Sequence, residues 1–77
     1  MNSSGYLKVK GTVKWFNEHK GYGFIHHNNK DYFVHFKEIR CEGFKTLPEG
    51  ARVRFTIAKS DKGDIAKDVT FENNLND

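Results

Sequence analysis

The sequence predicts an all-β domain, built as a small antiparallel barrel or sandwich. Segments that alternate apolar and polar residues recur along the chain, turn-forming residues separate them, and no segment is convincingly helical. The length of 77 residues fits one domain. Five short strands closed into a barrel match that length.

The first three expected strands lie in the aromatic part of the chain. Residues 8–17 (KVKGTVKWFN) are rich in β-forming residues, and Gly11 is a candidate for a bulge or bend. Residues 21–27 (GYGFIHH) form the second strand and residues 31–36 (DYFVHF) the third. The short polar turn at residues 28–30 joins these two strands into a hairpin.

The second half of the chain supplies the other two strands. Residues 37–50 form a longer connection that contains glycine and proline. Residues 52–59 (RVRFTIAK) alternate cleanly and predict the fourth strand. A turn at residues 60–64 (SDKGD) leads into the last strand, residues 65–71.

The expected domain limits and the cellular compartment follow from the tails, the cysteine content and the absence of long apolar runs. The domain is expected to span residues 8–71, with residues 1–7 and 72–77 as short tails. The single cysteine, Cys41, excludes an internal disulfide and suits a reducing compartment. No apolar run approaches the roughly 18 residues of a membrane span, and the N-terminal residues lack a signal-type apolar stretch. A cytoplasmic protein is therefore expected.

Alternation assigns the two faces of the strands. If Ile25 faces inward on the second strand, Tyr22 and Phe24 face outward. On the third strand Phe33 and His35 face outward, so the hairpin places Phe24 beside one of them. The expected core comprises Val13, Ile25, Val34, Ile39, Leu47, Val53, Phe55, Ile57, Ile65 and Val69.

Alternation fails in the first strand and is awkward in the third. Val13 and Trp15 would share a face, although one suits the core and the other an aromatic surface. A bulge or strong twist between them would resolve the conflict. Tyr32 points inward by parity, where its phenol needs space and a partner.

Charge and aromatic content point to a binding surface. The formal net charge is +3, and most basic and aromatic residues lie together within residues 1–45. The aliphatic residues already fill the inner face, so several rings remain for the surface. Apolar patches of that kind usually bind a partner. Rings interleaved with cations are typical of surfaces that stack bases and contact phosphates.

These residues resemble a known family. The stretch GTVKWFNEHKGYGFI…DYFVHF, residues 11–36, is similar to the signature of the cold-shock domain. Within it, KGYGFI resembles the family's first nucleic-acid-binding motif and YFVHF its second. Residues 42–57 (EGFKTLPEGARVRFTI) resemble the next segment, and residues 62–70 (KGDIAKDVT) match the last strand more loosely. The chain thus looks like a single-domain bacterial cold-shock protein.

The resemblance implies a five-stranded antiparallel barrel of OB type that binds single-stranded RNA and DNA. It implies no enzymatic activity, and we expect no cofactor or metal and a monomer. The implied stacking residues are Trp15, Tyr22, Phe24, Phe33, His35, Phe36 and Phe44, with Lys14, Phe16, Asn17, Lys20, Lys45 and Lys62 beside them.

Three positions depart from the family pattern. Tyr22 stands where Phe is usual, which keeps the ring and adds a hydroxyl. Tyr32 replaces a common aliphatic residue. The turn at residues 62–64 stands where many members have a Gly-Pro pair that lines the binding face, and Asp64 adds negative charge there.

The chemistry of stacking supports the same function. Each base stacked on a ring contributes roughly 1–3 kcal/mol with little sequence preference. A duplex hides its base faces, so the protein is expected to hold unpaired segments and oppose hairpins by mass action. That is RNA chaperoning without ATP; transcription antitermination and translation regulation need only the same binding.

Other classes fit the sequence less well. An RNA-recognition-motif domain also carries K-G-Y-G-F, but needs two amphipathic helices. A nucleophilic enzyme using Cys41 lacks an orienting third group, and a pure protein-interaction barrel would not need Lys14 and Lys20 beside the rings. A metal site would draw on residues whose spacing matches no zinc signature: His19, His26, His27, His35 and Cys41.

Overall fold

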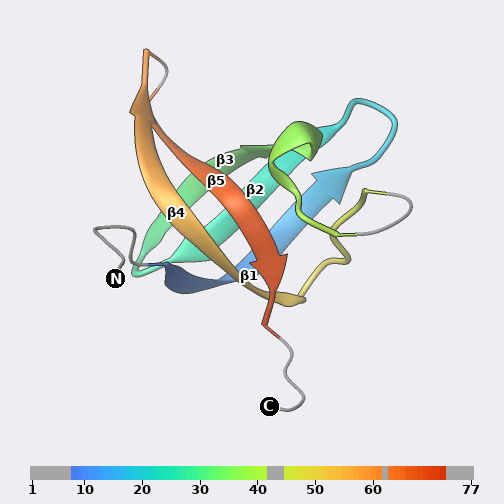
Figure 1. Cartoon of the computed structure of the whole chain (residues 1–77), viewed down its shortest axis with the longest axis horizontal. Coiled ribbons are helices and arrows are strands. Elements are labelled where there is room, and N and C mark those ends of the chain that lie inside the picture. Colours follow the sequence, from blue (N-terminus) through green and yellow to red (C-terminus); the bar gives the residue numbers. More distant parts are fainter. Residues whose placement is uncertain (1–7, 42–44, 62, 73–77) are drawn as a thin grey trace.

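Five strands close into a barrel in the computed structural model, which describes residues 8–41, 45–61 and 63–72 (Figure 1). The order around the barrel is β1-β2-β3-β5-β4, and β4 pairs with β1 to close it. The predicted all-β fold is confirmed, and each strand ends within one or two residues of its expected limits. The elements are β1 (Val9–Asn17), β2 (Tyr22–His27), β3 (Lys30–His35), the 3₁₀ helix η1 (Phe36–Glu38), β4 (Arg52–Ser60) and β5 (Gly63–Phe71).

One strand pairing corrects the expectation of a wholly antiparallel barrel. Four pairings are antiparallel, but β3 and β5 run parallel where Phe33 pairs with Ile65. Ile39 and Val69 add an isolated parallel bridge. The reason is geometric, because an odd number of strands in a closed ring cannot alternate direction at every step. The described residues contain no helix besides η1, which excludes the RNA-recognition-motif arrangement.

The hairpin between β2 and β3 is tighter than predicted. Asn28 and Asn29 have φ values of 53° and 67°, so both lie in the left-handed region. Two such residues form a type I′ turn, whose twist matches that of the flanking strands, and asparagine tolerates this conformation well. Lys30 is therefore not a turn residue but the first residue of β3, opposite His27.

The predicted irregularity in β1 is present. The register of β1 against β2 shifts between Val13 and Trp15, so Val13 is 1% exposed in the core while Trp15 is 39% exposed. The bulge considered at Gly11 is absent, because Gly11 pairs with Val53 in regular register and the shift lies after Val13. Gly11 is buried, and a Cβ there would lie 2.6 Å from the Ile25 side chain and 2.8 Å from the Phe55 ring. Its missing side chain lets the core pack against β1.

The core matches the prediction at eight of ten positions. Ile57 is 38% exposed rather than buried, and Ile65 is only half-buried. A second register shift in the β4–β5 pair accounts for Ile65. Three steps along β5 from Thr70 to Lys67 oppose two steps along β4 from Arg54 to Thr56, so the extra residue lies in β5, which buries Val69 and Ala66 rather than Ile65. The buried hydrophobic residues are Val13, Ile25, Tyr32, Val34, Ile39, Leu47, Val53, Phe55, Ala66 and Val69.

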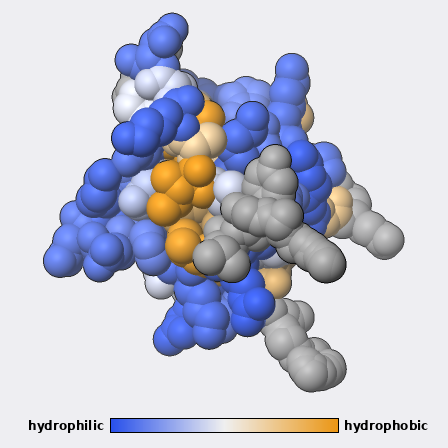
Figure 2. Space-filling view, turned by 60° about the vertical axis from the view of Figure 1, so that its left-hand side comes forward, coloured by the Kyte–Doolittle hydropathy of each residue, from blue (hydrophilic) through white to orange (hydrophobic). Residues whose placement is uncertain are grey.

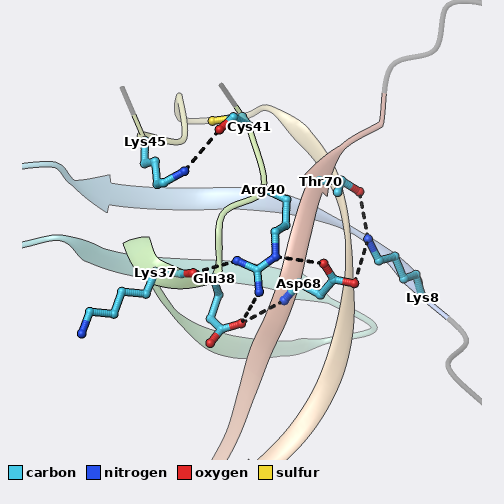
Figure 3. Close-up of polar contacts among 8 residues, drawn as sticks. All are labelled: Lys8, Lys37, Glu38, Arg40, Cys41, Lys45, Asp68 and Thr70. Atoms are coloured by element: carbon cyan, nitrogen blue, oxygen red, sulfur yellow. Dashed lines mark hydrogen bonds and ion pairs between the residues drawn. The ribbon is translucent and has the colours of Figure 1, made fainter. Parts of the chain in front are cut away.

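A cluster of charged side chains joins the segment after η1 to β5 (Figure 3). The Arg40 guanidinium donates to the Lys37 carbonyl at 2.8 Å, and its Nε lies 3.4 Å from an Asp68 carboxylate oxygen. The other Asp68 oxygen lies 3.4 Å from Lys8 Nζ. Glu38 accepts a hydrogen bond from the Asp68 backbone N–H at 3.2 Å. Two cations and two carboxylates therefore balance each other beside the β3–β5 contact.

Among the residues described, no helix has both the length and the apolar character needed to cross a membrane.

Candidate nucleic-acid interface

Four aromatic rings form a continuous cluster on the outer surface of β1, β2 and β3, and we call this cluster the aromatic platform. The Trp15 ring lies 5.7 Å from Tyr22 and 5.4 Å from Phe24, measured between centroids. Phe33 lies 5.5 Å from Tyr22, nearly parallel to it, and 5.8 Å from Phe24, edge to face. Tyr22, Phe24 and Phe33 are half-buried, so each packs on a neighbour and still presents surface to solvent.

Strand register explains how the sequence brings these rings together. Phe24 lies opposite Phe33, and Tyr22 lies opposite His35, so the hairpin pairs Phe24 with the first of the two predicted partners. The shift in β1 places Trp15 opposite Phe24. The alternation predicted for β2 is confirmed, since Gly23 and Ile25 are buried between the outward rings.

His35 and Phe36 form a second ring pair next to the platform. Their centroids lie 4.7 Å apart, and Phe36 is 39% exposed. The Phe36 backbone N–H donates to the Gly21 carbonyl, and its ring covers Gly21 so closely that a Cβ there would lie 2.9 Å away. His35 Nδ1 accepts the Lys37 backbone N–H at 3.2 Å, which caps η1 and fixes the imidazole.

Lys14 lies at the rim of the platform in an ion pair. Its Nζ lies 2.7 Å from one oxygen of Asp31, and His26 Nδ1 lies 2.9 Å from the other oxygen. The hydrogen bond from Lys14, followed by that from His26, holds the pKa of the Asp31 carboxyl below its usual range. Asp31 was missed from the sequence, because its partners come from two other strands.

Three predicted site residues at or near the β1–β2 turn differ in their contacts and exposure. Asn17 Oδ1 accepts the backbone N–H groups of His19 and Lys20, both at 2.9 Å, so this side chain shapes the turn. The Lys20 side chain is exposed there. Phe16 is half-buried and packs against the core, so it lies outside the platform. After the register shift Phe16 alternates back toward the interior.

The remaining predicted residues lie in loops. Lys45 is exposed, and its Nζ donates to the Cys41 carbonyl at 3.2 Å. Phe44 and Lys62 lie outside the described residues.

A hollow of about 780 Å³ continues the platform toward the β4–β5 turn. Phe24, Phe33 and Ile65 provide its apolar lining, and Lys30 and Asp64 lie among its polar residues. Lys30 Nζ lies 2.7 Å from an Asp64 carboxylate oxygen, and this hydrogen bond holds the pKa of Asp64 below its usual range. The negative charge expected of Asp64 thus has a cationic partner that the sequence did not reveal.

The candidate metal ligands do not converge in the part of the chain that the structure describes. No three histidine, cysteine, aspartate or glutamate side chains in those ranges lie close enough to hold a metal ion. The site therefore consists of rings, cations and ion pairs, a set suited to stacking flat groups and to contacting anions.

Comparison with known proteins agrees with this geometry. The family model described as "'Cold-shock' DNA-binding domain" matches residues 9–71. "Cold shock-like protein CspA" of Vibrio cholerae is 58% identical over 65 residues, which cover 82% of this chain and 93% of that protein. "Cold shock-like protein CspE" of Escherichia coli K12 is 56% identical over 64 residues, covering 80% and 93%.

A solved structure supports the fold from a greater evolutionary distance. The chain described as "drosophila Unr CSD456" superposes with a TM-score of 0.74 at 19% identity. The match covers 95% of this chain but only 30% of that one, and at this identity it supports the fold alone. The family match and the identities above show more: the chain belongs to the cold-shock domain family and is a nucleic-acid-binding protein of the cold-shock type.

Proposed function

We propose that the protein binds single-stranded RNA and DNA by stacking bases on the aromatic platform, as a monomer and without catalysing a reaction. The observation that carries this proposal is the contiguity of the four rings, whose centroid separations run from 5.4 to 5.8 Å. They lie on paired strands rather than on loops, so little order has to be imposed on them when a strand binds.

Stacking outweighs the charged contacts in this arrangement. Three stacked bases supply about 3–9 kcal/mol at roughly 1–3 kcal/mol each. Exposed ion pairs contribute about 0–1 kcal/mol apiece, and Lys14 must share its charge with Asp31. Because every base has a π-face, a site dominated by stacking has weak sequence preference.

The same argument favours unpaired strands over duplexes and leads to RNA chaperoning. In a duplex the base faces are already stacked, so the platform has no access to them. At a free protein concentration one hundred times Kd, one bound site stabilises the unpaired state by about 2.7 kcal/mol. That free energy opens marginal hairpins without ATP. Antitermination and translation regulation are consequences of the same opening, and they require a cytoplasmic location, which suits the single cysteine.

Truncation of a platform ring tests the proposal. Phe24→Ala and Phe33→Ala are each expected to weaken binding of an oligo-dT or oligo-U heptamer by more than about 1 kcal/mol, or at least fivefold, because a stacking surface is lost. Trp15, the single tryptophan, reports binding through fluorescence quenching. Circular dichroism checks that each variant remains folded.

Phe71→Ala is the matched control. Phe71 is 38% exposed, almost the same as Trp15, but it lies at the end of β5 rather than on the platform. Its truncation should leave affinity unchanged, and a duplex of equal length should quench Trp15 little. Unchanged affinity in a folded Phe24→Ala variant, or an equal loss in Phe71→Ala, would refute the platform.

A further inference from the structure

Three basic side chains lie together on the outer face of β1 and β4, outside the platform. They are Lys10, Arg52 and Arg54, and we call them the basic ridge. Arg52 and Arg54 flank Val53, which is 0% exposed, so both arginines point outward. Lys10 lies directly opposite Arg54 in the β1–β4 pair, and its side chain is 63% exposed.

The ridge keeps an unbalanced positive charge. Like charges opposite each other on neighbouring strands are destabilising. Lys10 has a carboxylate partner, Glu72, at 3.5 Å, but within the described ranges neither Arg52 nor Arg54 makes an ion pair. The cluster around Arg40 is different, because two carboxylates neutralise its cations (Figure 3).

The ridge is continuous with the platform across the barrel surface. Thr12 of β1 lies opposite both His26 of β2 and Arg52 of β4. Neighbouring strands lie about 4.8 Å apart, so the backbone of His26 is roughly 10 Å from that of Arg52. A polar hollow of about 280 Å³ fills this interval, with Lys10, Thr12, His26 and Arg52 among its lining residues.

The surface on the β4 side of the barrel is mostly hydrophilic. Figure 2 turns the left-hand side of Figure 1, where β4 lies, toward the viewer, and shows mostly hydrophilic surface beside one narrow apolar strip. His26 connects this region to the platform rim, because it hydrogen-bonds the same Asp31 carboxylate that holds Lys14.

We propose that the basic ridge binds the phosphodiester backbone of a single strand where that strand leaves the platform past His26. Arginine donates in a fork that matches phosphate oxygens, and an anion there would relieve the repulsion between Lys10 and Arg54. OB folds cover about 4–16 nucleotides, so the ridge would lengthen the site beyond the bases held on the rings. This inference rests on the proposed function.

Oligonucleotides of two lengths distinguish binding at the ridge from binding at the platform. An oligo-dT hexamer is held by the rings, whereas a dodecamer also reaches the ridge. For single strands, affinity changes with salt with a slope of about −0.7 per phosphate contact, which corresponds to about fivefold per contact at 0.1 M salt. The double variant Arg52→Gln/Arg54→Gln should therefore lower the affinity for the dodecamer by about 25-fold. The slope of log affinity against log salt should become shallower by about 1.4, while the affinity for the hexamer stays unchanged.

Single-charge variants control for net charge. Lys67→Gln removes one exposed positive charge from β5 and should leave dodecamer affinity unchanged, whereas Arg54→Gln should weaken it about fivefold. Glu72→Gln removes the carboxylate next to Lys10 and should strengthen dodecamer binding. Circular dichroism confirms folding, and Trp15 fluorescence measures every affinity.

The outcomes distinguish this inference from the proposed function. Unchanged dodecamer affinity in the double variant overturns the ridge, as does an equal loss for both lengths or an equal loss in Lys67→Gln. When one of these results overturns the ridge, a loss of affinity for both oligonucleotides in Phe24→Ala still supports the platform. If the unmodified protein binds neither oligonucleotide, the proposed function fails and the ridge fails with it.

Discussion

Replacement of Gly23 by alanine is expected to separate β1 from β2. Gly23 lies opposite Phe16 in the β1–β2 pair and is buried. A Cβ at this position would lie 2.2 Å from the Trp15 carbonyl oxygen and 2.7 Å from Phe16 Cα. Both atoms belong to the backbone, so no side-chain rotation can relieve the overlap.

The loss of stability in Gly23→Ala follows from how far β1 has to move. Contacts below 3.0 Å are essentially absent around real Cβ atoms, so the Trp15 carbonyl must retreat by most of an ångström. Overpacking that forces backbone shifts typically costs about 1–3 kcal/mol. Because two backbone overlaps occur at once, we expect Gly23→Ala to lower the free energy of unfolding by about 3 kcal/mol or more, the upper end of that range. The shift also displaces Trp15, so affinity for an oligo-dT heptamer should fall as well.

Equilibrium denaturation in urea, followed by Trp15 fluorescence and circular dichroism, measures the loss. Gly50→Ala is the control, because a Cβ there meets nothing within 4 Å and only the φ of +85° is strained. That strain costs roughly 1–2 kcal/mol. If Gly23→Ala is no less stable than Gly50→Ala, the close approach of β1 and β2 does not limit this position and the reasoning is wrong.

Two further predictions concern charge and core. The pKa of Asp31 is lowered by Lys14 and His26, so its ionised form stabilises the folded state at neutral pH, and this contribution disappears as the pH falls below about 4. Asp31→Asn should be less stable than wild type at pH 7, and the gap should close toward pH 2.5; parallel urea midpoints across that range would contradict the ion pair. Ile57→Thr should change stability by less than about 0.5 kcal/mol, because the side chain is 38% exposed. Ile25→Ala, at a fully buried position, should cost about 2–5 kcal/mol, and similar losses for the two variants would contradict the observed exposure of Ile57.

Local alternation was enough to predict the strands and the face that carries Tyr22, Phe24 and Phe33, while the OB barrel and the full set of stacking residues came from the family resemblance. Tyr22, Phe24 and Phe33 are separated from the core residues by the two-residue period of a strand, so their face could be assigned without coordinates. The conflict between Val13 and Trp15 revealed the bulge in β1.

The remaining features depend on register between distant strands. Nothing local marks the extra residue in β5, so strict alternation back from Val69 assigned Ile65 to the core, where Ala66 lies instead. The partners of Asp31 come from β1 and β2, and their pairing becomes visible only when the three strands are aligned. Phe16 was placed beside the rings through the family resemblance, whereas after the bulge it packs against the core.

The contact between β3 and β5 gives the barrel a place where it can open. In the described ranges the backbone pairing between the two sides is limited to the Phe33–Ile65 pair and the Ile39–Val69 bridge, and side-chain ion pairs such as Lys30–Asp64 supply the other links. Local openings begin where the backbone hydrogen bonds are fewest, so we expect amide protons along this contact to exchange with solvent before those of the other strand pairs. Phe33 also belongs to the platform, and a base stacked on it would favour the closed barrel by mass action. If bases stack there as proposed, nucleic-acid binding and local opening of the barrel would be coupled through the Phe33 side chain.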